Sequence, residues 1–343
     1  MRVAVVWNEA AEINPSGHPS LGYYRAGVES VVAALQESGH ETLLCEGDKE
    51  LLATLERFMP PDPQARPSGI VFNMAYGSQG EWRCSLVPTM LEMAGIPYTG
   101  PGPLGAALEV DKVITKKLIR DGGVSTPNFR VMRRGTEGTG GLRFPVVVKP
   151  RYESTSLGLQ LVHESTGLRQ AVEMIVTQYA QDALVEEYID GREICVALLG
   201  NEEIEVLPPV EHDFGDRETR FITLEDKKHM GAAEPQKICP AQMGSELATM
   251  LRDLSVATFR ACLGRDYARV DFRIDSSGRP FVLEINFCPS LNNTHSYVRA
   301  ATTGGYSFSN LVNRILDLAH KRYVGIGIPK AEHPLNRGLT FPP

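Results

Sequence analysis

Residues 267–289 narrow the range of folds open to this chain more than any other stretch. Apolar and polar side chains alternate along both halves of the stretch, in the period-two pattern of strands whose two faces differ. Asp275-Ser-Ser-Gly278 separates the halves and has the composition of a tight turn. With the turn centred between its last two residues, the predicted hairpin brings two opposed pairs onto one face, Asp271 with Glu284 and Arg269 with Asn286.

Two opposed carboxylates repel each other, so this face of the hairpin needs a compensating charge. Carboxylates and the amide oxygen of Asn are hard ligands, which Mg²⁺ accepts together with phosphate oxygens and water. One interpretation is a metal site at Asp271, Glu284 and Asn286. The other is an exposed hairpin face on which Arg269 and Arg273 neutralise the acidic residues. The rigid turn and the polar run that follow the hairpin favour the metal site.

The composition is that of an ordinary globular protein. The chain has 343 residues, enough for two or three domains with their own cores. Its formal net charge of −7 argues against a nucleic-acid or anionic-membrane partner, and no apolar run approaches the length of a membrane span. Six cysteines are scattered without CxxC spacing, and the N-terminus lacks a signal-peptide profile. We therefore expect a cytoplasmic protein with reduced thiols.

Residues 1–100 alternate between short apolar strands and helices. Strands are predicted near residues 3–7, 41–45 and 69–73, and helices near 23–38, 48–58 and 88–94. This alternation predicts a parallel sheet with helices on its faces. Ligands bind such sheets at the carboxyl ends of the strands, which here fall at residues 8–12 and 73–81.

Three later segments are candidates for nucleotide binding. A buried strand ends in Lys149, and the polar loop 150–158 that follows it is suited to wrap phosphate groups with backbone N–H groups and hydroxyls. Residues 184–193 combine a strand with several acidic side chains, which could equally be solvated acids on an edge strand. The polar run 211–234 is too long for a plain connection and is typical of a lid or a disordered segment.

These features occur together in one known family. Arg-Val-Asp-Phe-Arg at 269–273, followed by Leu-Glu-Ile-Asn-Phe-Cys-Pro-Ser at 283–290, resembles the catalytic hairpin of the ATP-grasp enzymes, and most of all that of the D-alanine–D-alanine ligases. Residues 91–129 resemble the junction between the first two domains of these ligases. The resemblance implies a mixed α/β protein, with the ATP-grasp fold behind an N-terminal Rossmann-like parallel-sheet domain. It divides the chain into an N-terminal domain at 1–104, a central subdomain with a lid loop at 105–190, a catalytic subdomain at 191–325 and an extended tail at 326–343.

The resemblance also implies ATP and Mg²⁺, with two ions expected and Mn²⁺ as a substitute. Asp271, Glu284 and Asn286 match the metal ligands. Residues 186–189 match the segment that holds the adenine edge through the main chain. The full set of matching ATP-binding positions is Lys112, Lys149, Glu153, Glu186, Glu187, Tyr188, Ile189, Glu193, which corresponds to the ribose carboxylate, and Leu283.

The reaction that the resemblance implies joins a carboxylate to an amine. The carboxylate attacks the γ-phosphate of ATP to give an acyl phosphate, and an amine then attacks the acyl carbon and releases phosphate. Preorganised donors stabilise the oxyanion that forms. Arg269 and the backbone N–H near Ser290 match these donors, although the family carries glycine at the second position. Ser156 of the lid loop completes the catalytic set, in a loop where Ser154 replaces a glycine.

The substrate-facing positions depart from the family pattern. Tyr76 stands where the ligases carry histidine, Phe221 stands where they carry tyrosine, and the alignment is broken after the first strand. We therefore expect an amino acid or small carboxylic acid as substrate, other than a pair of D-alanines. A homodimer is compatible with this function. The candidate substrate-binding residues are Glu9, Glu12, Tyr76, Arg220, Phe221, Asn292, His295 and Ser296.

Three other functions compete with this hypothesis. The chain could be a genuine D-alanine–D-alanine ligase with unusual pocket residues, or a nucleotide-binding module without catalysis. Retention of Lys112 and Lys149 together with the whole hairpin set argues against the second of these. A Rossmann-type oxidoreductase is disfavoured because no GxGxxG motif follows the first strand.

Overall fold

The structure of the protein, a computed structural model, describes most of the chain. The described residues are 1–8, 22–63, 67–77, 80–154, 156–217, 220–223, 226 and 235–325, with 22–24 and 325 described through their backbone alone. Two of the predicted substrate residues, Glu9 and Glu12, lie outside these ranges, as does the predicted tail 326–343.

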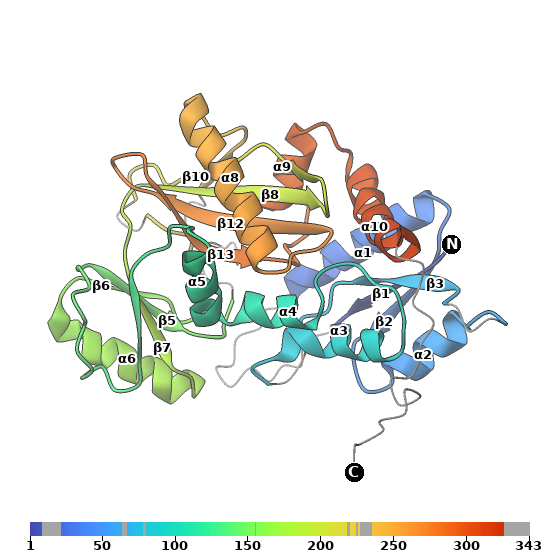
Figure 1. Cartoon of the computed structure of the whole chain (residues 1–343), viewed down its shortest axis with the longest axis horizontal. Helices are drawn as coiled ribbons and strands as arrows, with labels where there is room; N and C mark the ends of the chain where they lie inside the picture. The colour runs from blue at the N-terminus through green and yellow to red at the C-terminus, as the bar shows by residue number, and fades with distance from the viewer. Residues whose placement is uncertain are drawn as a thin grey trace, which may run out of the picture.

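The N-terminal part contains the expected parallel sheet, with strand order β2-β1-β3. Its strands are β1 (Arg2–Trp7), β2 (Glu41–Glu46) and β3 (Gly69–Asn73), and its helices are α1 (Gly22–Glu37), α2 (Leu51–Phe58) and α3 (Arg83–Met93). Because side chains alternate along β1, Val3 and Val5 pack against α1, whereas Ala4 and Val6 pack against α2 and α3. The sheet is therefore covered by helices on both faces (Figure 1).

The middle of the chain forms a four-stranded antiparallel sheet, ordered β4-β7-β5-β6. Its elements are α4 (Pro103–Val110), α5 (Lys112–Asp121), β4 (Phe129–Met132), β5 (Val146–Pro150), β6 (Gln160–Val162), α6 (Ser165–Tyr179) and β7 (Ala183–Glu187). The sequence predicted a single helix over residues 106–112, which is wrong. The helix ends at Val110, and Asp111 caps α5 by accepting hydrogen bonds from the backbone N–H groups of Val113 and Ile114 at 3.1 Å.

The last part forms a second antiparallel sheet, ordered β11-β10-β8-β12-β13, with β9 also paired to β8. Its elements are β8 (Arg192–Gly200), β9 (Ile204–Val206), β10 (Val210–Asp213), β11 (Gln236–Ile238), α8 (Ser245–Ala261), β12 (Tyr267–Ile274), β13 (Pro280–Asn286), α9 (Ser296–Thr303) and α10 (Phe308–Gly325). The polar run predicted as a loop over 211–234 thus begins as strand β10, paired to β8 and β11. In Figure 1, α8 crosses this sheet, and α10 lies beside α1.

The two faces of this last sheet explain where a site can form. On one face Ile194, Val196, Val270 and Phe272 form a continuous apolar core beneath α8. On the other face Tyr267 packs towards α9 and α10 at one end, and the buried Phe281 lies opposite Arg273 at the other end. Between these ends the face carries polar side chains, and Glu284 on it interacts electrostatically with Lys149 of the central sheet.

The predicted register of the hairpin is confirmed, with one irregularity. Asp271 pairs with Glu284 and Arg269 with Asn286, but a β-bulge follows, so that Phe272 pairs with Val282. Strict alternation would have placed Leu283 on the apolar face. The bulge instead buries Val282 in the core and leaves Leu283 half-buried beside Glu284.

A buried carboxylate ties the N-terminal and C-terminal parts together. Asp266 is fully buried and accepts hydrogen bonds from the backbone N–H of Gly100 at 2.8 Å and the side-chain amide of Asn201 at 3.0 Å. It also forms an ion pair with Arg322 of α10, at 2.9 Å. Removing one partner of a buried ion pair leaves the other charge uncompensated, which costs about 3–5 kcal/mol.

We therefore expect Asp266→Asn to lower the melting temperature by several degrees. Asparagine tolerates the left-handed backbone that Asp266 adopts, with φ of 65°, so the loss would come from the charge rather than from backbone strain. Thermal unfolding followed by circular dichroism checks this, with the exposed Asp253→Asn on α8 as the control. Equal melting temperatures for the two variants would show that the buried pair contributes no net stability.

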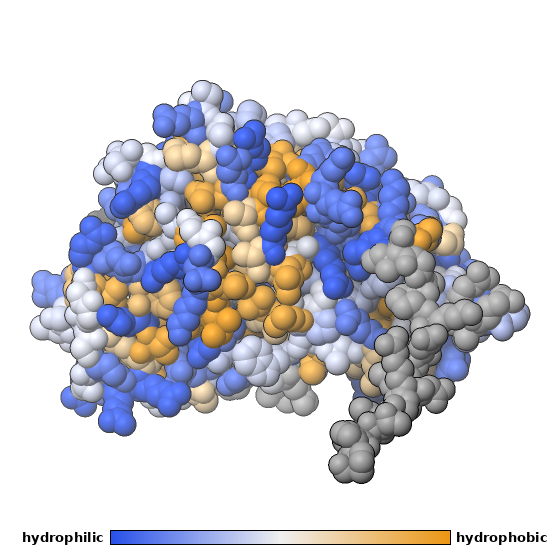
Figure 2. All heavy atoms as spheres, in the orientation of Figure 1, coloured by the Kyte–Doolittle hydropathy of each residue, from blue (hydrophilic) through white to orange (hydrophobic). Residues whose placement is uncertain are grey.

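No helix among the described residues is long and apolar enough to cross a membrane. Figure 2 shows apolar residues gathered over α4 and α5 and again beside α8, with polar residues around them. The exposed Leu104 and Ile114 belong to these two helices.

Candidate active site

The polar face of the hairpin forms one wall of the candidate site. Arg269 donates from Nε and Nη2 to the two carboxylate oxygens of Asp271, at 2.6 and 2.7 Å. Asn286 donates from Nδ2 to Asp271 at 3.1 Å, so its amide oxygen is the atom suited to a cation. Glu284 lies opposite Asp271 in the strand register. This face is half-buried rather than exposed, although the Arg269 side chain does neutralise Asp271 as the alternative interpretation required.

The donor set fits a hard cation that shares its coordination with another molecule. Two carboxylates and one amide oxygen come together here, and among the described residues no cluster of three or more His, Cys, Asp and Glu side chains could hold a metal by itself. Mg²⁺ commonly takes one or two protein carboxylates and completes its octahedron with water and phosphate oxygens. The residues present therefore fit Mg²⁺ bound together with a phosphate chain.

Arg269 combines burial with a strong ion pair. Burial by itself lowers the pKa of a guanidinium, but the Asp271 carboxylate outweighs this and raises the pKa of Arg269. The fork to Asp271 uses Nε and Nη2, and Nη1 has no hydrogen-bond partner among the described residues. Nη1 is therefore the part of the guanidinium that the contact with Asp271 leaves available for another acceptor.

The opposite wall is the face of the central sheet that turns away from α6. Lys149 on β5 donates to Glu186 on β7 at 2.5 Å, and Lys116 from α5 contacts the other oxygen of Glu186 at 2.9 Å. Lys116 is fully buried and also donates to Thr126 Oγ1 at 2.8 Å. Burial lowers the pKa of Lys116 to about 8, and Glu186 opposes that fall. Glu186 is thus held between two ammonium groups, which keep its own pKa low despite burial.

Lys112 and Lys149 both lie within electrostatic reach of Glu284 on the hairpin. Burial lowers the pKa of Lys112 even though the nearby Glu284 carboxylate opposes the shift. For Lys149 burial is outweighed by Glu186 and Glu284, and its pKa rises. Glu284 therefore interacts electrostatically with both lysines. A bound phosphate chain would add negative charge between these lysines and a cation on the hairpin.

The segment predicted to hold an adenine edge connects the two sheets. The side chain of Glu187 accepts from Arg143 at 2.8 Å, and the Tyr188 backbone N–H donates to Pro145 at 3.0 Å. A pocket of about 310 Å³ lies beside this connection. It is lined by Glu187, Tyr188 and Ile189 on one side and by the hairpin turn and Phe281 on the other; Leu283 is not part of it.

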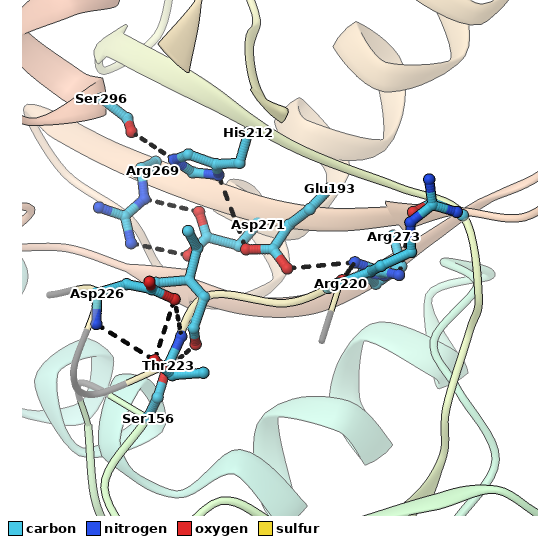
Figure 3. A network of polar contacts seen from close by, with 12 residues as sticks. Ser156, Glu193, His212, Arg220, Thr223, Asp226, Arg269, Asp271, Arg273 and Ser296 are labelled. Carbon is cyan, nitrogen blue, oxygen red and sulfur yellow. Dashed lines mark hydrogen bonds and ion pairs between the residues drawn. The ribbon is translucent and has the colours of Figure 1, made fainter. Parts of the chain in front are cut away.

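A chain of polar contacts runs from this connection along the sheet to α9 (Figure 3). Glu193 of β8 contacts Arg273 at 3.3 Å and His212 of β10 at 3.7 Å. The imidazole of His212 is hydrogen-bonded to the hydroxyl of Ser296 at 3.0 Å. The predicted ribose carboxylate, Glu193, is therefore linked through His212 to the predicted substrate residue Ser296.

The two predicted lid segments contact each other through Ser156 and Ile222. Ser156 has a left-handed backbone, with φ of 60°, and its hydroxyl donates to the carbonyl of Ile222 at 2.8 Å. Phe221 packs edge-on against the ring of Tyr188, with 6.3 Å between centroids. Glu153 accepts from Gln181 at 2.7 Å and its carbonyl accepts from Lys112. The first lid is thus attached to Lys112 through Glu153, and the second is attached through Phe221 to Tyr188 in the connection between the sheets.

The remaining predicted substrate residues gather around the turn that follows β13. The hydroxyl of Tyr76 donates to the carbonyl of Cys288, which joins the N-terminal part to this turn. Asn292 accepts from Thr294 at 3.2 Å, and His295 is the N-cap residue of α9. Ser290 has a φ outside the left-handed region, so its backbone does not require the glycine that the family carries. The thiol of Cys288 is buried and its pKa is raised, which fits a packing role.

Lys116 and His212 were not predicted as site residues, and Arg273 was predicted only to neutralise the acidic residues of the hairpin, whereas it contacts Glu193 at 3.3 Å. Lys116 lies four residues after Lys112, a spacing that places both on one helical face. Arg273 continues the alternation of Arg269 and Asp271 and so shares their face. These two signals were present in the sequence. His212 gave no such signal, because it lies in the polar run that reads as a loop.

Comparison with known proteins agrees with the resemblance in the sequence. A family model described as "D-ala D-ala ligase C-terminus" matches residues 118–317. Protein y4sG of Sinorhizobium fredii, whose name states no activity, is 64% identical over 335 residues, covering 96% of this chain and 99% of that protein. The D-alanine–D-alanine ligase of Moorella thermoacetica is 30% identical over 300 residues, covering 84% of this chain and 92% of that protein.

The fold also matches a solved structure. The crystal structure of the D-alanine–D-alanine ligase from Bacillus anthracis complexed with ATP superposes with a TM-score of 0.75, covering 95% of this chain and all of that chain at 21% identity. This likeness supports the arrangement of the sheets, and the family follows from the sequence matches. The chain belongs to the D-alanine–D-alanine ligase family of ATP-grasp carboxylate–amine ligases.

Proposed function

We propose that the protein is an ATP-dependent ligase that joins a carboxylate to an amine through an acyl phosphate. The observation that carries the proposal is the placement of Glu284 opposite Asp271 and within electrostatic reach of Lys112 and Lys149. Acidic side chains on one wall suit a cation, and ammonium groups on the other suit phosphate oxygens. Asn286 completes the cation-binding set.

In this proposal each wall has a distinct task in phosphoryl transfer. Lys112 and Lys149 hold the phosphate chain, and the segment 187–189 with Glu193 holds the nucleoside. Asp271, Glu284 and Asn286 would hold Mg²⁺, which when bound neutralises phosphate charge and orients the γ-phosphoryl group. The substrate carboxylate attacks the phosphorus atom, the bond to the β-phosphate oxygen breaks, and ADP leaves.

In the second step the amine attacks the acyl carbon, and the carbon–oxygen bond to phosphate breaks. The tetrahedral oxyanion needs donors that are already in place, and the Nη1 group of Arg269 and the N–H near Ser290 are our candidates. The loops that meet at Ser156 and Ile222 would exclude water, which otherwise hydrolyses the acyl phosphate. The products are an amide, ADP and phosphate.

For the substrates, we propose an acid and an amine that are not both D-alanine. The Tyr76 hydroxyl is already used by the Cys288 carbonyl, and Phe221 offers an aromatic ring without a hydroxyl. A site built around different polar groups discriminates strongly against a substrate that leaves those groups unpaired. The matches to D-alanine–D-alanine ligases keep the plain family activity as the second candidate.

Phosphate release on mixing the protein with ATP, Mg²⁺ and a panel of D- and L-amino acids and small carboxylic acids tests the proposal. We expect release that depends on an acid–amine pair, with a product whose mass equals the two substrates minus water. D-Alanine alone should give little product. D-Alanyl-D-alanine formation with kcat in the usual range of roughly 1–10³ s⁻¹ would refute the altered specificity and establish the second candidate.

A further inference from the structure

We propose that Arg273 is a positioning residue that couples nucleotide binding at the connection between the sheets to closure of the loop at 220–223. The proposal rests on the proposed function for the identity of the nucleotide site. Arg273 lies on β12, two residues beyond Asp271, and its side chain is 3% exposed. It is one of the few charged side chains buried this deeply in the described part of the molecule.

The guanidinium of Arg273 distributes its donors over three separate segments. Nε donates to the carbonyl of Ile189 at 2.9 Å, and Nη2 donates to the carbonyl of Gly191 and the hydroxyl of Tyr188, both at 3.1 Å. Nη1 contacts Glu193 at 3.3 Å and donates to the carbonyl of Arg220 at 2.5 Å. A guanidinium has five N–H donors, and five acceptors surround this one.

Because every N–H donor of Arg273 already has an acceptor, we assign this residue a positioning role rather than direct contact with a ligand. Arg273 has no spare donor with which to recognise a ligand directly. Its planar fork is rigid, so displacement of one acceptor strains the contacts to the others. Arg273 therefore transmits the position of the connection at 188–191 and of the Glu193 carboxylate to the Arg220–Phe221 peptide.

The loop at 220–223 has only a few other attachments in the described structure. Phe221 packs against Tyr188, the hydroxyl of Tyr188 lies 3.5 Å from the Arg220 carbonyl, and Ile222 accepts from Ser156 of the first lid. At its far end Asp226 holds Thr223 and Arg217. Figure 3 shows Arg273, Arg220 and Glu193 gathered at one end of the network and Ser156, Thr223 and Asp226 at the other. Arg273 is thus the charged anchor that joins this loop to the predicted adenine and ribose contacts.

Coupling of this kind has a measurable consequence. A nucleotide that orders the connection and Glu193 should also slow hydrogen exchange at the amides of residues 220–223, and the loop should in turn raise nucleotide affinity. Coupling between two sites is reciprocal and typically amounts to roughly 5–150-fold in affinity. A residue that only stabilised the fold would change the melting temperature without changing this response.

The test compares hydrogen exchange with and without a saturating non-hydrolysable ATP analogue and Mg²⁺. In the unsubstituted protein we expect the analogue to slow exchange at residues 220–223. Absence of that protection with the analogue bound would overturn the inference without any variant. In Arg273→Met we expect the analogue to bind at least about 5-fold more weakly and to leave exchange of the loop unchanged. Arg273→Lys keeps the positive charge but cannot form the planar fork. Its affinity for the analogue and its loop protection should therefore lie between those of the unsubstituted protein and Arg273→Met.

Arg192→Met is the matched control, because Arg192 also forms a fork, to Glu211 at 2.7 and 2.6 Å, but on the opposite face of the same sheet. It should retain both the affinity and the loop protection. Undiminished protection in Arg273→Met would contradict the inference. The experiment requires nucleotide binding alone, so a protein that binds the analogue but forms no product would refute the proposed function and still test the role of Arg273.

Discussion

Replacing Glu284 by glutamine should reduce substrate-dependent phosphate release on the order of a thousandfold while leaving the fold intact. A neutral amide of the same shape binds Mg²⁺ poorly, and the stabilisation that a metal gives to transferring phosphate is worth several kcal/mol, with about 1.4 kcal/mol for each tenfold in rate. The change also removes the negative charge that supports the protonated forms of Lys112 and Lys149. Steady-state phosphate release checks the rate, and circular dichroism checks the fold.

The control for this variant is Glu246→Gln, which removes an exposed carboxylate from the first turn of α8. It should retain the activity of the unsubstituted protein. Full activity in Glu284→Gln would mean that the hairpin does not hold the catalytic cation, and the assignment of the hairpin would then be wrong.

Replacing Arg269 by lysine should lower kcat by about 10²–10³-fold, with a much smaller effect on nucleotide affinity. Loss of one preorganised donor to an oxyanion typically has this effect on kcat. Lysine keeps the positive charge but cannot form the two-pronged contact with Asp271 and still offer donors on its other side. Single-turnover rates and nucleotide titration separate the two effects.

Arg265→Lys is the control variant. Arg265 lies just before β12, but it is partly exposed and pairs with Glu92 at 3.5 Å. Its kinetics should match those of the unsubstituted protein. If Arg269→Lys instead weakened nucleotide binding and left the single-turnover rate unchanged, Arg269 would act in binding rather than on the oxyanion.

The hairpin shows which features of the site can be predicted from the local sequence pattern. The period-two alternation predicted the pairing of Asp271 with Glu284, because a register with one buried face cannot slip by one residue. The bulge at Leu283 could not be predicted in the same way. It depends on how Val282 and Phe272 fill the core beneath α8, which is a matter of tertiary packing.

The contacts of Lys149, Lys116 and Glu186 and the strand within the predicted second lid could not be predicted from the sequence. Lys149 was identified at the end of a buried strand, but the pairing of Glu186 with both Lys149 and Lys116 joins residues 37 and 70 positions apart. Spacing along the chain gives no information on such contacts. Residues 211–213 have the composition of a loop, and they form part of a strand only because they pair with β8 and β11. Glu9 and Glu12 stay predictions, since they lie outside the described residues.

The most direct test of the account follows the oxygen atoms of the substrate carboxylate. Once an acid–amine pair that supports turnover is known, the acid is supplied with ¹⁸O in its carboxylate and the released phosphate is examined by mass spectrometry. An acyl-phosphate route breaks the carbon–oxygen bond in the second step, so one ¹⁸O atom should appear in each phosphate. Phosphate without ¹⁸O, formed together with ADP, would show that water attacks ATP directly and would contradict the proposed ligase mechanism.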